Sequence, residues 1–155
     1  MKRILIAFCL VCFAFGAAQA QEKSKPPAQD LDANALPEDL LIADAKKNLR
    51  VAQLYFTRKA YIGALQRCEE TIAVYQRFKK FDEVLYIAGM SSVRLSRKEG
   101  KQPLPAGMTA QNYLILARQY LTQLIKEHPK SEFRKRAEEE LRGLGDSALQ
   151  TGAKQ

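Results

Sequence analysis

The chain has 155 residues, a formal net charge of +8, 46% hydrophobic residues and 27% charged residues, with no tryptophan. The apolar fraction is enough for a folded core, and the charged fraction is ordinary for a soluble domain. Without the segments at its two ends, the chain is long enough for one domain and too short for several domains.

Residues 1–20 are typical of a secretory signal peptide. Lys2 and Arg3 precede an uncharged apolar run over residues 4–15, and Ala18-Gln19-Ala20 forms a cleavage site of the small-x-small type. We expect cleavage between Ala20 and Gln21. The alternative, a membrane-spanning helix, needs about 20 apolar residues, which is longer than this run.

Two of the three cysteines, Cys9 and Cys12, lie within the predicted signal peptide, so we assign no redox role to their C-x-x-C spacing. Neither follows a small residue, as a bacterial lipid-anchor signal requires, so we expect no lipid anchor. Cys68 alone remains, and one cysteine cannot form an internal disulfide. Its apolar helical setting favours a buried hydrophobic residue over a reactive thiol.

Residues 21–36 have Pro26-Pro27 and no apolar period, which indicates a flexible leader. A helix is expected over about 37–59, with Pro37 in its first turn, followed by a turn and a second helix over about 62–78. Apolar residues at offsets of three and four define the inner faces of these helices: Leu41, Ala45, Leu49, Ala52, Tyr55, Phe56, Ala64, Leu65, Cys68, Ile72 and Tyr75.

A third helix is expected over about 82–96, with Asp82 as its N-cap. Gly89 lies in the middle of this helix, where glycine costs about 1 kcal/mol relative to alanine. We therefore expect a neighbouring helix to approach closely there. Ala52 occupies the matching place in the first helix.

Residues 97–108 contain two glycines and two prolines and predict a loop, which is either functional or a neutral insertion. A fourth helix is expected from its cap Thr109 to about 127, closed by Pro129. Ser131 is expected to cap a last helix, which ends at Gly143 and Gly145, covers the open end of the stack and leaves a frayed tail over 146–155. The helical domain is thus predicted over 37–145.

Two helical hairpins and a closing helix predict an all-α, tetratricopeptide-repeat (TPR)-like α-solenoid. Over about residues 40–149 the chain resembles the BamD-like outer-membrane assembly lipoproteins, a subgroup of TPR proteins. The residues that carry this resemblance are Tyr55-Phe56-x-Arg58-x-Ala60-Tyr61-x-x-Ala64, Ala88-Gly89, Ala117-x-x-x-Leu121-x-x-Leu124, His128-Pro129-Lys130-Ser131 and the closing stretch through Ala137 and Leu141.

The resemblance implies an exported, periplasmic scaffold, peripheral to the outer membrane, that binds components of the machinery for β-barrel protein assembly. Two departures stand against this role. Family members carry a lipidated cysteine and about five repeats, whereas this chain has neither a suitable cysteine nor more than two hairpins. The alternative is a soluble periplasmic TPR module that serves cell-wall synthesis or secretion.

The sequence contains no motif of an enzyme, such as G-x-S-x-G, H-E-x-x-H or a phosphate-binding loop. The one histidine, His128, precedes Pro129 at a helix end and fits a partner of the helix dipole better than a catalyst. Consecutive side chains on a helix point in different directions and cannot converge on one ion. Ion pairs with neighbouring cations therefore explain the run Glu138, Glu139 and Glu140 better than a metal site does. We expect no enzymatic activity, no cofactor and no metal.

Positive charge is concentrated over residues 46–101, which hold 13 Lys or Arg and 5 Asp or Glu. Export disfavours nucleic acid as the partner, whereas anionic lipid surfaces, an acidic protein or simple solvation of a helix face all fit. A TPR stack presents the first helix of each hairpin on its concave side. The outward-facing residues predicted there to bind peptide segments are Lys46, Gln53, Tyr86, Met90 and Arg94.

Overall fold

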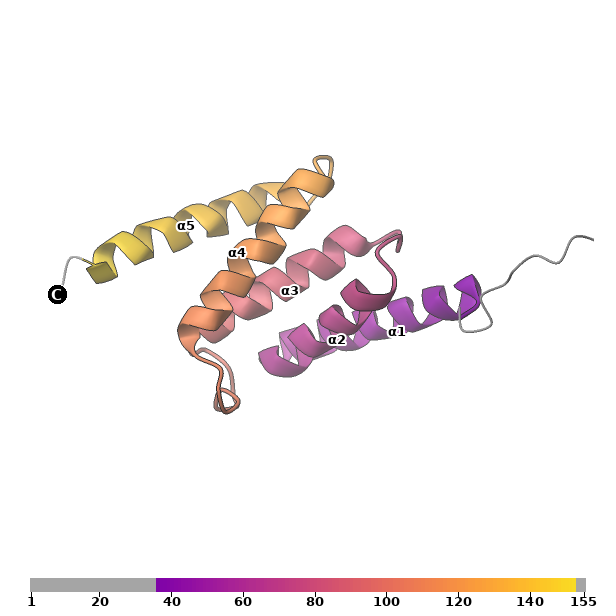
Figure 1. Ribbon diagram of the computed structural model, residues 1–155, viewed down its shortest axis with the longest axis horizontal. Helices are drawn as coiled ribbons and strands as arrows, with labels where there is room; N and C mark the ends of the chain where they lie inside the picture. Colours follow the sequence, from indigo (N-terminus) through magenta and orange to yellow (C-terminus); the bar gives the residue numbers. More distant parts are fainter. Residues whose placement is uncertain (1–35, 153–155) are drawn as a thin grey trace, which may run out of the picture. The chain divides into compact units, whose positions relative to one another are not determined.

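The computed structural model describes residues 36–152, and side chains within residues 36–145. The predicted signal peptide, its cleavage site at Ala20 and Gln21, and nearly all of the predicted leader lie outside the described residues. Within them the chain forms five helices and no strand, which confirms the all-α prediction (Figure 1). The helices are α1 Glu38–Thr57, α2 Tyr61–Val74, α3 Phe81–Ser96, α4 Ala110–Glu127 and α5 Arg134–Gly152.

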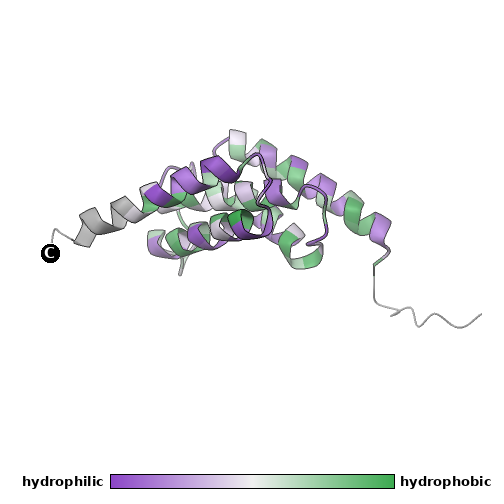
Figure 2. Cartoon of the chain, turned by 90° about the horizontal axis from the view of Figure 1, so that it is seen from above, coloured by the Kyte–Doolittle hydropathy of each residue, from purple (hydrophilic) through white to green (hydrophobic). Residues whose placement is uncertain are grey.

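Each helix packs against the next one in the chain, and α1 also contacts α3. In Figure 1, α1 and α2 run side by side, and α3, α4 and α5 follow them in turn. Hydrophilic and hydrophobic residues alternate around most of the helices (Figure 2). Each helix therefore turns one face to its neighbours and another to solvent.

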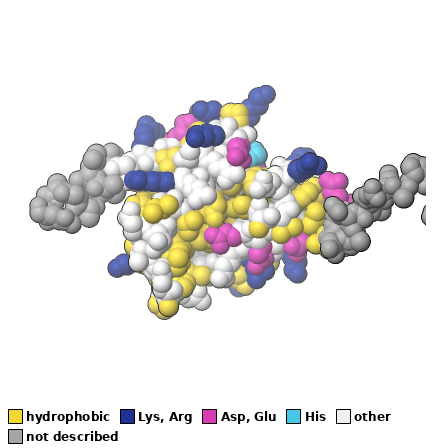
Figure 3. All heavy atoms as spheres, in the orientation of Figure 1, with side chains coloured by type: hydrophobic (Ala, Val, Ile, Leu, Met, Phe, Trp, Pro, Cys, Tyr) yellow, Lys and Arg dark blue, Asp and Glu magenta, His cyan; other side chains and the backbone are white. Residues whose placement is uncertain are grey.

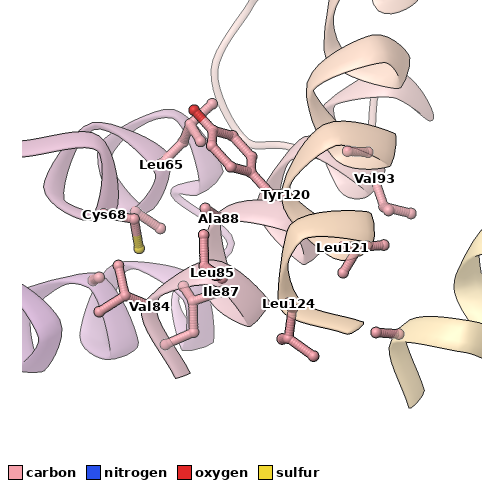
Figure 4. Close-up of a cluster of buried hydrophobic side chains, with 14 of the residues drawn as sticks. Leu65, Cys68, Val84, Leu85, Ile87, Ala88, Val93, Tyr120, Leu121 and Leu124 are labelled. Atoms are coloured by element: carbon pink, nitrogen blue, oxygen red, sulfur yellow. The ribbon is translucent and has the colours of Figure 1, made fainter. Parts of the chain in front are cut away.

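The core is built around α3, where 11 of 16 residues are buried. Leucines and other apolar side chains from α2, α3 and α4 meet there (Figure 4). The sulfur of Cys68 points into this cluster, so the prediction that Cys68 is a buried hydrophobic residue is confirmed. The cluster as labelled in Figure 4 consists of Leu65, Cys68, Val84, Leu85, Ile87, Ala88, Val93, Tyr120, Leu121 and Leu124.

Gly89 lies where α4 packs tightly against α3. A Cβ atom placed on Gly89 would lie 2.5 Å from Cδ2 of Leu121, well inside van der Waals contact. The prediction that this glycine admits a neighbouring helix is confirmed, and the neighbour is α4. Ala52, the matching small residue of α1, is fully buried as well.

Thr109 is the N-cap of α4, as predicted. Its hydroxyl oxygen accepts from the backbone N–H of Asn112, and the side-chain oxygen of Asn112 accepts from the N–H of Thr109. The prediction that Asp82 caps α3 is wrong, because α3 begins one residue earlier and its cap position is Lys80. The Asp82 carboxylate instead accepts a hydrogen bond of 2.7 Å from Ser131, which ties α3 to the α4–α5 turn.

Helix α2 ends at Val74, earlier than the predicted end near residue 78. Tyr75 has left the helix, and its hydroxyl donates to Glu38 at the start of α1 over 2.9 Å. Phe78 then turns into the core from the connection between α2 and α3. These two long-range contacts favour the early end of α2.

The last helix does not stop at Gly145 as predicted but continues to Gly152. Neither Gly143 nor Gly145 has the positive φ that would end a helix, and among the described residues Gly107 is the one glycine that does. A glycine inside a helix lowers its stability without breaking it. Of the predicted tail, residues 153–155 lie outside the described part.

Candidate partner-binding surface

Three of the five predicted binding residues, Tyr86, Met90 and Arg94, recur every four residues on α3 and so form one stripe along it. The stripe lines a hollow of about 370 Å³ between α3 and α5. On the other side of the hollow, α5 contributes Arg136, Glu139 and Glu140. We call this the α3–α5 hollow.

The apolar part of the α3–α5 hollow comes from an aromatic pair and a methionine. The ring of Tyr86 stacks on that of Phe133, with ring centroids 4.7 Å apart. Met90 is only 5% exposed, so it does not point outward as predicted but forms the floor of the hollow. A flexible, polarisable methionine beneath an aromatic pair adapts well to different apolar side chains.

Two ion pairs fix the charged rim of the hollow. Arg94 pairs with Glu99 at 2.9 Å, and Glu140 pairs with Arg97 at 3.1 Å. The hydrogen bond that Arg94 donates to the Glu99 carboxylate raises the pKa of Arg94, which keeps this guanidinium charged. By contrast, Arg136 and Glu139 are exposed, and neither forms an ion pair within the described residues. They leave one free cation and one free anion for a ligand.

The other two predicted binding residues lie elsewhere. Gln53 of α1 donates a hydrogen bond to Glu83 of α3, so its side chain joins two helices. Lys46 is exposed on α1 and does not line the α3–α5 hollow. The structure therefore brings the α3 candidates together at the α3–α5 hollow, and neither α1 candidate lines it.

The contribution of α5 to the hollow was not predicted from the sequence. Local ion pairs were expected for the glutamate run, and Arg134 and Glu138 do form one at 2.8 Å. Glu140, however, pairs with Arg97, which follows α3 and lies 43 residues earlier in the chain. A local pattern on one helix contains no signal for such a partner.

A second hollow, of about 500 Å³, lies where α1 begins and α2 ends. Leu36, Leu41 and Val74 line it together with Tyr75. None of the predicted binding residues lies there. It borders Leu36, the first described residue of the chain.

The titratable and metal-ligating side chains of the described residues are spread over the domain. They contain no group of three His, Cys, Asp or Glu side chains arranged to hold a metal ion. Burial, reinforced by Glu69 and Glu83, raises the pKa of the Cys68 thiol to about 12, so this thiol stays protonated at neutral pH. His128 ends α4, as its place before Pro129 predicted, and its ring lies 6.0 Å from that of Phe81.

The distribution of side-chain types differs between the middle and the rim of the domain. On the face in Figure 3, hydrophobic side chains occupy much of the middle, and Lys and Arg stand mainly at the rim. No helix within residues 36–152 is long and apolar enough to cross a membrane. The large hydrophobic residues that are most exposed are Leu36, Leu40, Leu54, Val74 and Ile115.

Comparisons of the chain with protein-family models, with curated proteins and with solved structures find no match. The assignment of a site therefore depends on the geometry of the chain itself. That geometry points to the α3–α5 hollow, where an apolar floor and free charges of both signs lie within one small area.

Proposed function

We propose that this domain is a TPR-like adaptor that binds a segment of a partner protein in the α3–α5 hollow. The packing of the helices supports a stack of hairpins. Besides the contacts between successive helices, α1 contacts α3, and Tyr120 of α4 donates a hydrogen bond of 2.9 Å to Glu69 of α2. Contacts between helices one and two places apart are expected of a helical solenoid.

The observation that carries this proposal is the composition of the hollow. Aromatic residues, methionine and arginine are enriched where proteins bind one another. Here Tyr86, Met90 and Arg136 lie around one concavity, beside the free carboxylate of Glu139. An extended or helical peptide could place one apolar side chain on the floor and hydrogen-bond to the two free charges.

We further propose that the partner belongs to the bacterial envelope, in the assembly of outer-membrane β-barrel proteins. This part of the proposal depends on the signal peptide predicted for residues 1–20 and on the resemblance to BamD-like proteins. A soluble periplasmic TPR module for cell-wall synthesis or secretion would use the same hollow with a different partner. The two roles are separated by what the protein binds.

The test is to isolate the tagged chain from envelopes dissolved in mild detergent and to identify the proteins that accompany it. Two neighbouring exposed cations of α5 provide a matched pair of variants. Arg136 lines the hollow, whereas Lys135 does not. Arg136→Ala is expected to reduce the recovery of the partner about tenfold, since arginines at the centre of an interface often contribute 1 kcal/mol or more. Lys135→Ala is expected to leave it unchanged.

Recovery of a β-barrel insertase in near-equal amount would support the assembly role. Recovery of another partner from the soluble fraction would contradict the assembly role and support a general adaptor role. If Arg136→Ala and Lys135→Ala lose the partner equally, or if neither loses it, the hollow is not the binding site. Circular dichroism of both variants checks that the helices are intact.

A further inference from the structure

Helices α1 and α3 end with the same short motif. Each has a hydroxyl residue followed by Arg-Lys: Thr57-Arg58-Lys59 and Ser96-Arg97-Lys98. The hydroxyls donate to backbone carbonyls one turn earlier, Thr57 to Leu54 over 2.9 Å and Ser96 to Val93 over 2.8 Å. The two helix ends are thus alike in sequence and in local structure.

The lysine of each motif adopts a backbone conformation that favours glycine. Lys59 and Lys98 have φ values of 60° and 57°, and no other non-glycine residue in the described part has a positive φ. Both stand in the same helix-ending turn, with two backbone hydrogen bonds at matching lengths. These bonds are Lys59 to Phe56 and Lys98 to Leu95 at 3.0 Å, and Ala60 to Tyr55 and Glu99 to Arg94 at 2.9 Å.

A lysine at such a position is strained relative to glycine, because its Cβ atom crowds the backbone. Strain of this kind is found at functional sites, where the side chain is needed for more than stability. Here it occurs twice, each time with a lysine. The shared property of the two positions is an exposed positive charge.

Both motifs lie at the same end of the domain. The backbone N–H of Lys101, in the α3–α4 loop, donates to the carbonyl of Lys59, in the α1–α2 turn, over 3.3 Å. Figure 1 shows this loop beside the end of α1 and the start of α2. Arg97 is engaged with Glu140, but the remaining cations of these segments are exposed and form no ion pair within the described residues. We call these four the cationic end: Arg58, Lys59, Lys98 and Lys101.

We propose that the cationic end binds the surface of an anionic lipid bilayer. Three of its four cations are lysines, which act as mobile point charges and do not impose the fixed fork geometry by which arginine recognises a carboxylate. Exposed apolar residues accompany them. Leu54 is 44% exposed one turn before the Lys59 motif, and Pro103 and Pro105 are exposed in the α3–α4 loop. Cations beside exposed apolar groups suit the interface between headgroups and acyl chains.

The proposal predicts a graded, salt-sensitive attraction. Each Lys or Arg near an anionic membrane strengthens binding about fivefold, so four cations together amount to a factor of several hundred. The attraction falls off within about 8 Å at physiological ionic strength. Cations at the opposite end of α3 and α4 therefore contribute little when the cationic end faces the bilayer.

The test is to measure binding of the full chain to vesicles by sedimentation. One set of vesicles contains phosphatidylglycerol and phosphatidylcholine in equal parts, and the other contains phosphatidylcholine alone. The quantity compared is the difference between the two sets, because an apolar contribution from any part of the chain is common to both. We expect the wild-type chain to prefer the anionic vesicles and to lose that preference at high salt.

The decisive variant is Lys59→Gly with Lys98→Gly. It removes two cations and relieves two strained turns, so we expect a fold at least as stable as wild type but anionic binding about 25-fold weaker. Loss of binding in a variant of undiminished stability cannot be attributed to unfolding. The matched control is Lys79→Gln with Lys130→Gln, which removes two exposed cations beside the α2–α3 and α4–α5 turns, at the opposite end.

Equal losses in the two double variants would mean that net charge alone attracts the chain, and the proposal would fail. The absence of any preference for anionic vesicles would overturn it directly. Binding of the wild-type chain to soluble poly-L-glutamate through Lys59 and Lys98, without binding to vesicles, would identify an acidic polypeptide as the partner instead. Arg136→Ala, which affects the α3–α5 hollow, should retain vesicle binding, so this proposal and the proposed adaptor function can fail separately.

Discussion

Helices α3 and α5 differ in how much of their surface other helices cover. Helix α3 contacts α1, α2 and α4, and 11 of its 16 residues are buried. Helix α5 packs mainly on α4, and up to residue 145 its buried residues are Ala137 and Leu144. The middle of the domain therefore supplies most of the stability, whereas the outer helix and the loop ends expose charged side chains to solvent.

The largest effect expected from this difference is that of truncating leucines in the two regions. Leu121→Ala removes a fully buried side chain between α3 and α4, and we expect a loss of about 4 kcal/mol in the free energy of unfolding. Leu144→Ala removes a buried leucine at the contact of α5 with α4, where the outer helix can shift inward to fill the space. We expect about 2 kcal/mol there, measured by urea denaturation.

Equal losses for the two leucine variants would contradict the comparison, because α5 would then be as tightly held as the centre. A further check is hydrogen exchange of the wild-type chain. Backbone amides of α3 should exchange at the rate of global unfolding, and those of α5 faster, by local opening.

The next prediction compares the same substitution, glycine to alanine, in α3 and in α5. Gly89→Ala places a methyl group within 2.5 Å of Leu121 in a packed core, so the crowding should exceed the gain in helix propensity and cost about 1–2 kcal/mol. Gly145→Ala meets no atom within 4 Å and should stabilise the domain by about 0.5–1 kcal/mol. Thermal unfolding should shift in opposite directions for the two variants.

The buried thiol provides a test of the centre by pH. Burial raises the pKa of Cys68 from 9.0 to about 12 in the folded domain. Between these values the thiol ionises in the unfolded chain but not in the folded one, so the folded state binds more protons and stability falls as pH rises. The contribution is about 1.4 kcal/mol per pH unit within this window.

Cys68→Ala should therefore show a shallower loss of stability between pH 9 and about 12 than the wild-type chain. Burial and Glu69 also raise the pKa of Tyr120, so part of the loss should remain in the variant. The measurement is urea denaturation at a series of pH values. The same pH dependence with and without Cys68 would mean that this thiol is not desolvated.

The sequence predicted best where a local rule and the tertiary packing agree. Apolar spacing located the helices, a threonine located the start of α4, and an interior glycine located a close helix contact, now assigned to Leu121. At each of these places the residue is explained by its own helix and the face it turns to a neighbour. This is why the core around Gly89 could be read from the pattern alone.

The candidate site was predicted only in part, because it depends on contacts between distant segments. The repeat spacing selected Tyr86, Met90 and Arg94 as outward-facing candidates, which line one hollow, but it gave no sign that Met90 is covered. The pair between Arg97 and Glu140 and the tether between Lys59 and Lys101 join segments more than 40 residues apart. Helix α5 also continued through two glycines, whose backbone conformation the sequence does not determine.

The smallest expected effect has the sign opposite to that of most substitutions. Lys59→Gly and Lys98→Gly, made singly, should each raise the free energy of unfolding by about 0.5–1 kcal/mol. Glycine adopts the positive φ without crowding, which stabilises the folded state. Glycine also gives the unfolded chain more freedom, and the expected gain is what remains after this opposing effect. Lys59→Ala and Lys98→Ala remove the same charges but retain the Cβ atom, so they should not stabilise. A gain in the alanine variants equal to that in the glycine variants would assign the effect to charge repulsion among the four cations instead of to the backbone. In the centre each residue is fixed by its neighbours, so a gain of stability from replacing lysine at both helix ends would show that the periphery retains these side chains at a cost.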